Sequence, residues 1–103
     1  MALKEKYKTL ILPRAKQEVH EAAFYYESIR KGLGKLFYKE FKNHSLTLNN
    51  FPFFEEKYNI VRVLPLKKFP YLIHFTVNES EKTVSIQAIT NNHQDPNTTK
   101  LKL

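Results

Sequence analysis

Hydrophobic residues in the first third of the chain recur with the period of an α-helix. A short β-prone run at residues 7–12 comes first, and Pro13 closes it because proline has no amide hydrogen to donate within a central strand. Apolar side chains then follow at intervals of three and four positions. They are Val19, Ala22, Ala23, Tyr26 and Ile29. The pattern predicts one strand followed directly by an amphipathic helix.

The only two glycines of the chain, Gly32 and Gly34, mark the end of this helix. Glycine adopts the left-handed conformation without strain, so it commonly terminates helices. Helical spacing resumes at Leu33 and continues to Leu48, and Pro52 follows. A short corner between two amphipathic helices predicts an antiparallel helical hairpin.

Beyond Pro52 the hydrophobic period changes to two, which is typical of strands. We expect strands at residues 58–64, 71–77 and 84–88. The polar run at residues 78–82 predicts a hairpin connection between the second and the third.

Alternation along each predicted strand assigns its residues to two faces. In the first strand we assign Val61 and Val63 to the core, so that Arg62 points to the opposite, solvent-exposed face. In the third, Val84, Ile86 and Ala88 share one side. In the second, Tyr71, Ile73, Phe75 and Val77 lie opposite Leu72, His74 and Thr76.

Strands that are apolar on one face and polar on the other form an antiparallel sheet with one exposed side. The helical hairpin is expected to pack on the apolar side. We therefore predict an α+β fold with the order β-α-α-β-β-β and a single domain over residues 1–103.

Charge and composition narrow the range of functions. The chain has 17 lysines and arginines against 10 acidic residues, a net charge of +7, so its surface should attract polyanions or an acidic protein. It has no cysteine, and its four histidines are scattered, so we expect no metal site and no cofactor. No apolar run is long enough to span a membrane, and the first residues do not resemble a signal peptide. We expect a cytoplasmic protein.

Several segments taken in order resemble a known family. They are the sequence EAAFYY from Glu21, the corner GLGKLF from Gly32, Arg62 in a strand, the sequence FPYLI from Phe69, and Asp95-Pro96 after the last strand. In this order they are similar to toxins of the RelE/ParE superfamily, which belong to type II toxin-antitoxin systems. The resemblance covers nearly the whole chain and is greatest to ParE-like, plasmid stabilisation proteins.

The resemblance implies partners. Toxins of this family are held inactive by a cognate antitoxin that wraps over them. ParE-like members bind and poison DNA gyrase, whereas RelE-like members are endonucleases that cut mRNA on the ribosome. Whether the free toxin forms a homodimer is left open by the sequence.

Candidate site residues follow from the predicted open face. Arg62 is the main candidate for contact with phosphate, because its guanidinium can bind phosphate oxygens in a bidentate manner. Lys67 and Lys68 add positive charge at the edge of that face, and His74 can line a shallow groove beside Thr76. Simple surface roles for each of these side chains are the alternative.

Relatives often have a histidine and an arginine after the last strand, where this chain has Asn91 and Gln94. Neither can transfer a proton near neutral pH. His93 can substitute in proton transfer if the loop turns appropriately. Asn91 and His93 are also candidate binding residues.

We therefore interpret the chain as a ParE-like toxin that binds gyrase without catalysis. The alternatives are a RelE-like endonuclease using Arg62, Lys67, Lys68 and His93, and a decayed toxin that only binds antitoxin.

Overall fold

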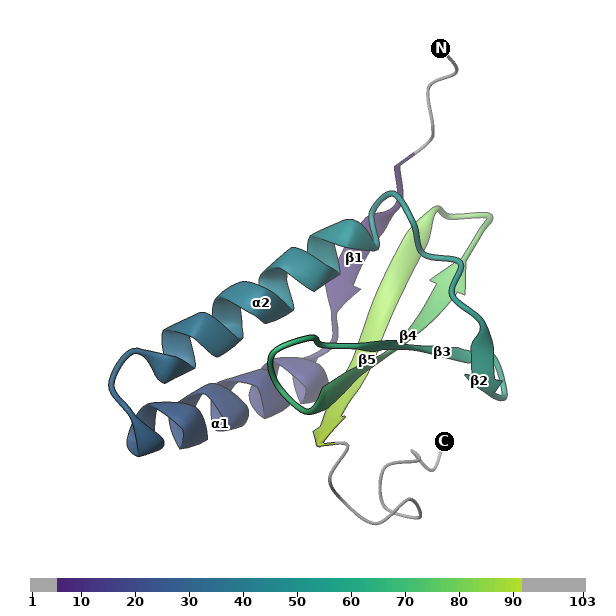
Figure 1. Cartoon of the computed structure of the whole chain (residues 1–103). Coiled ribbons are helices and arrows are strands. Elements are labelled where there is room, and N and C mark those ends of the chain that lie inside the picture. The colour runs from purple at the N-terminus through teal and green to yellow at the C-terminus, as the bar shows by residue number, and fades with distance from the viewer. Residues whose placement is uncertain (1–5, 92–103) are drawn as a thin grey trace.

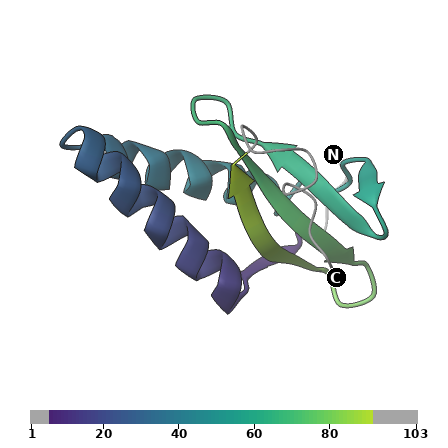
Figure 2. The same ribbon diagram turned by 90° about the horizontal axis from the view of Figure 1, so that it is seen from below.

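Two antiparallel helices lie on one face of a five-stranded sheet (Figure 1). The computed structural model describes residues 6–91. Seen from below, the helices lie side by side and extend beyond the sheet at one end (Figure 2). The elements are β1 (Lys8–Ile11), α1 (Pro13–Ile29), α2 (Leu33–Thr47), β2 (Glu56–Tyr58), β3 (Val61–Pro65), β4 (Tyr71–Asn78) and β5 (Thr83–Asn91). The predicted α+β architecture is confirmed. Neither described helix has the length and apolar character needed to cross a bilayer.

The strand order is β1-β5-β4-β3-β2. Strands β3, β4 and β5 are antiparallel, as predicted, whereas β1 is parallel to β5, so the sheet as a whole is mixed. The run expected as one strand at residues 58–64 is two strands, because the chain reverses at Asn59. Asn59 has a φ of 50°, a left-handed conformation that asparagine tolerates better than most residues. This reversal creates β2 at the edge of the sheet.

The corner between the helices depends on its two glycines. Gly32 has a φ of 90°, and its amide donates to the carboxylate of Glu27 at 3.0 Å. A Cβ atom at Gly34 would lie 2.4 Å from the carbonyl oxygen of Ala23. Only glycine therefore allows α1 and α2 to approach this closely.

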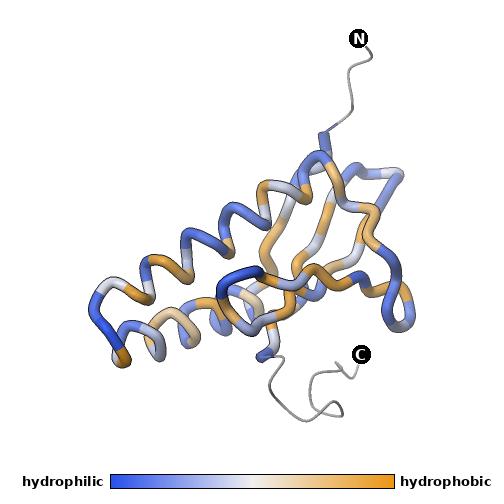
Figure 3. The backbone as a smooth tube through the Cα atoms, in the orientation of Figure 1, coloured by the Kyte–Doolittle hydropathy of each residue, from blue (hydrophilic) through white to orange (hydrophobic). Residues whose placement is uncertain are grey.

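The main core lies between the helices and the sheet. Figure 3 shows hydrophobic residues recurring along both helices and along the strands. Ile73 and Phe75 of β4 are buried in it, on the predicted face. In β5 the prediction for Ala88 is wrong, because Ile89 faces the helices in its place. The register of β5 against β4 shifts between His74 and Phe75, which inverts the alternation beyond that point.

Candidate functional site

Arg62 does not point to the open face of the sheet. It pairs with Phe75 across β3 and β4, and residues directly opposite each other on neighbouring strands share a face. Phe75 belongs to the core on the helix side, so Arg62 lies at the border of that side. Val63 pairs with His74 on the other face. The predicted orientation of Arg62 and of the two valines is therefore wrong.

The Arg62 guanidinium contacts other groups of the protein through both of its terminal nitrogens. Nη1 donates to the carbonyl oxygen of Phe54 at 2.5 Å, and Nη2 lies 3.4 Å from a carboxylate oxygen of Glu56. The guanidinium also lies 5.5 Å from the ring centre of Phe53. Nε is buried and has no hydrogen-bond partner among the described residues. The side chain of Arg62 is 17% exposed, and its contacts with Phe53 and Phe54 link the segment before β2 to the sheet.

His74 lies on the face opposite the helices, as the alternation predicted, but it is buried. Its Nδ1 is hydrogen-bonded to the hydroxyl of Tyr58 at 2.9 Å, and its Nε2 to the hydroxyl of Thr90 at 2.8 Å. Burial, assisted by the positive charge of Arg14, lowers the pKa of His74 to about 4. The expectation of an exposed histidine is wrong. His74 links three strands as a neutral ring.

Lys67 and Lys68 are exposed in the turn between β3 and β4, and this turn lies against α2. Their backbone amides donate to the carboxylate of Glu40, at 2.5 Å from Lys67 and 2.9 Å from Lys68. Glu40 is 8% exposed. The sequence analysis missed it, although Glu40 falls within the apolar stripe that runs from Phe37 to His44.

Replacing Glu40 with glutamine is expected to lower the free energy of unfolding by about 2 kcal/mol. The amide NH2 group would face a backbone amide that now donates to a carboxylate oxygen, and a hydrogen bond to a charged group contributes roughly 1.5–3 kcal/mol. Urea unfolding measures the change. The control is Glu21→Gln in α1, an exposed carboxylate, for which we expect a change below about 0.5 kcal/mol. Equal losses in both variants would contradict a role for Glu40 in fixing the turn.

Asn91 ends β5 and is half-buried, with its side chain hydrogen-bonded to Tyr71. Burial raises the pKa of Tyr71, and this hydrogen bond acts in the opposite direction. His93 and Gln94 lie outside the described residues. The ring of Tyr71 packs with those of Tyr26 and Phe37 in an aromatic cluster on the helix side, so Asn91 is tied to this cluster.

The predicted site residues do not come together within residues 6–91. Arg62 and His74 lie on opposite faces of the sheet, and Lys67 and Lys68 lie against α2. No group of three histidines or carboxylates among the described residues is placed to bind a metal ion.

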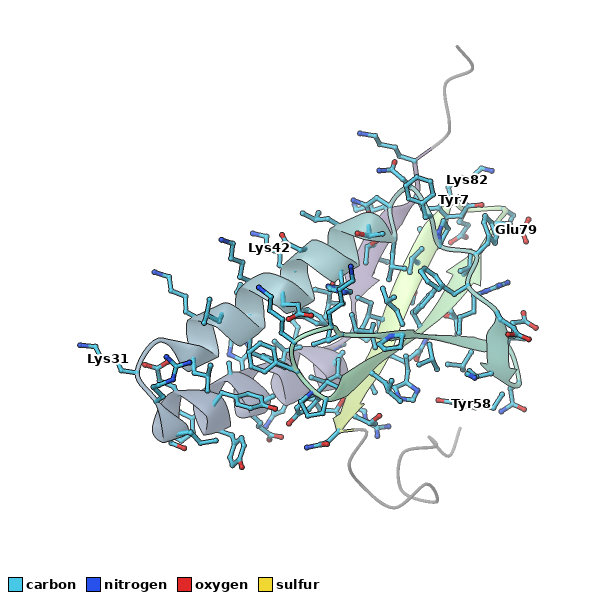
Figure 4. The ribbon with its side chains drawn as sticks, in the orientation of Figure 1. Tyr7, Lys31, Lys42, Tyr58, Glu79 and Lys82 are labelled. Atoms are coloured by element: carbon cyan, nitrogen blue, oxygen red, sulfur yellow. The ribbon has the colours of Figure 1, made fainter. Side chains whose placement is uncertain are left out.

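A groove that the sequence analysis did not anticipate lies between β1 and α2. It has a volume of about 510 Å³, and Tyr38, Lys42 and Leu46 of α2 line one side. Lys6, Tyr7 and Lys8 line the other side. Figure 4 labels Tyr7 and Lys42 from the two sides of the groove. β1 is the last strand on this side of the sheet, so its outer edge faces the groove. Among residues 6–91 no strand pairs with this edge, and the amide of Tyr7 before β1 donates to the carbonyl oxygen of Asn49 at 2.8 Å. Apolar walls, lysines and an outer strand edge suit an acidic, partly apolar peptide.

Comparisons with known proteins test the architecture. No family model and no curated protein matches the chain. Among solved structures, it is similar to a chain of the chromosomal ParDE TA system from P. aeruginosa, with a TM-score of 0.70. The identity is 15%, and the match covers 85% of this chain and 98% of that chain. At this identity the likeness establishes the fold alone, and it confirms that the chain has the RelE/ParE-like fold expected from the resemblance.

Proposed function

We propose that the chain is the toxin of a type II toxin-antitoxin system. In this proposal it acts in the cytoplasm, inhibits DNA gyrase by binding it, and is neutralised by a cognate antitoxin. The observation that carries the proposal is the shared fold with a chain of a ParDE system, over 98% of that chain.

The arrangement of the candidate residues favours binding over catalysis. Cleavage of RNA requires a proton-transfer group close to the residue that contacts the phosphate. The described histidine of the sheet, His74, is neutral and hydrogen-bonded at both ring nitrogens, and Arg62 lies on the other face. The guanidinium of Arg62 is also bonded to the carbonyl oxygen of Phe54 and paired with the carboxylate of Glu56.

The groove between β1 and α2 is our proposed site for the antitoxin. An extended segment can add to the outer edge of β1 beyond Tyr7 through backbone hydrogen bonds. Its carboxylates would lie near Lys6, Lys8 and Lys42, and its apolar residues would contact Tyr38 and Leu46. A segment that orders only on binding suits this mode of recognition.

A supercoiling assay tests the proposal. Purified chain is titrated into DNA gyrase, ATP and relaxed plasmid, and we expect loss of supercoiling with accumulation of cleaved DNA. Prior incubation with the product of the adjacent antitoxin reading frame should restore supercoiling. Active gyrase at every concentration, together with mRNA cleavage in a ribosomal translation assay, would establish the endonuclease alternative. A folded chain inactive in both assays would be a decayed toxin.

Substitutions at two leucines of α2 distinguish binding of the antitoxin from binding of gyrase in the same assay. Leu46 is 53% exposed and lines the groove, whereas Leu36 is 50% exposed and does not. Leu46→Glu is expected to keep gyrase inhibition but to lose rescue by the antitoxin, because a carboxylate would face apolar antitoxin side chains. Leu36→Glu should keep both. Rescue of both variants alike would place the antitoxin elsewhere.

A further inference from the structure

Three lysines form a stripe along the exposed side of α2. Lys35, Lys39 and Lys42 are all exposed. At 100° per residue they fall within an arc of about 60°, over a length of about 10 Å. Figure 4 shows Lys42 pointing into solvent, away from the sheet. We call these three residues the α2 lysine stripe.

No exposed carboxylate of α2 offsets this charge. Glu40 is the only acidic residue in the helix, and it is buried and bound to the backbone amides of Lys67 and Lys68. The same contact places two further exposed lysines, Lys67 and Lys68, against α2 at Glu40. The stripe and the turn together carry five exposed lysines, on two elements that Glu40 holds together.

We propose that the α2 lysine stripe and the adjoining turn bind the phosphodiester backbone of duplex DNA without reading its sequence. Duplex DNA carries about one negative charge per 1.7 Å of its axis, so a row of lysines about 10 Å long faces several phosphates. Lysine acts here as a point charge that needs no precise geometry. A rigid helix holds the row straight.

An acidic protein fits this surface less well than DNA. The groove between β1 and α2 combines lysines with apolar walls, but Lys35 and Lys39 lie outside it. Tyr38 and Leu46 are exposed at the groove end of the stripe, and Leu36 is exposed on the side toward the turn, so the apolar area next to Lys35 and Lys39 is small for a protein contact. The α2 lysine stripe is therefore complementary to a polyanion mainly through its charge.

The inference goes beyond the proposed function and does not depend on it. If the chain does inhibit gyrase, the stripe would contact the DNA that gyrase holds. Binding to free DNA requires no gyrase, so the two proposals can fail separately.

Fluorescence anisotropy of a labelled duplex of about 20 base pairs tests the inference between 50 and 200 mM salt. The first variant is Lys35→Gln with Lys39→Gln, and the matched control is Lys16→Gln with Lys57→Gln. The control removes the same charge from exposed positions in α1 and β2. Glutamine preserves helix propensity, and thermal melting confirms that both variants are folded.

We expect the wild-type chain to bind the duplex at micromolar concentration in 50 mM salt. In the stripe variant the slope of log K against log salt should fall by about 1.8, since each lost phosphate contact removes about 0.9, and affinity should fall roughly tenfold. The control should stay within about twofold. Equal weakening in both variants, tighter binding to poly-glutamate or to duplex RNA than to DNA, or no binding at 50 mM salt would each overturn the inference.

Discussion

Replacing Phe37 with alanine is expected to lower the free energy of unfolding by about 3–5 kcal/mol. The ring of Phe37 is fully buried and lies 5.4 Å from Tyr26, 5.1 Å from Phe69 and 5.2 Å from Tyr71, measured between ring centres. It thus connects α2 to α1, to the turn before β4 and to β4 itself. The cavity would lie where these elements meet, and surrounding aromatic rings cannot collapse to fill it.

Urea unfolding measures this effect, with Leu36→Ala as the control. Leu36 precedes Phe37 in α2 but is 50% exposed, so its replacement should cost less than about 1 kcal/mol. Phe37→Ala should also weaken binding at the groove, because Tyr38, Leu46 and the rest of α2 would lose their fixed position on the sheet. Equal losses of stability in both variants would contradict a role for the aromatic cluster in joining the two helices to the sheet.

Acidification is expected to destabilise the protein through His74. Its pKa is about 4 in the folded state, below the value of 6.5 for a free histidine. Above pH 6.5 the ring is neutral in both states and contributes no dependence on pH. As the pH falls from 6.5 to 4, the unfolded chain binds the proton more readily, so stability is lost across this window. The total loss from this group is about 3 kcal/mol.

Unfolding at pH 7, 5.5 and 4.5 measures this loss in the wild-type chain and in His74→Gln. The difference between them isolates His74, because the variant has no ring to protonate. His20→Gln, at an exposed position of α1, is the control and should keep the wild-type slope. A wild-type slope in His74→Gln would contradict the lowering of the His74 pKa by burial and by the charge of Arg14.

The candidate site was the least predictable part of the molecule. Alternation identifies which residues of a strand share a face, but β3 is apolar on both faces, with Val61 and Val63 on one and Leu64 on the other. Assigning Arg62 to a face therefore required the pairing of β3 with β4. The burial of His74 likewise depends on side chains that arrive from β2 and β5.

Local sequence patterns determined the helical hairpin, its glycine corner, the three antiparallel strands and the positive charge, because each arises from residues close together in the chain. Tertiary structure alone decided the face of Arg62, the buried positions of His74 and Glu40, the register shift in β5 and the groove beside β1. Each of these depends on which distant segments pair or pack together, and that choice is made by the free energy of the whole core.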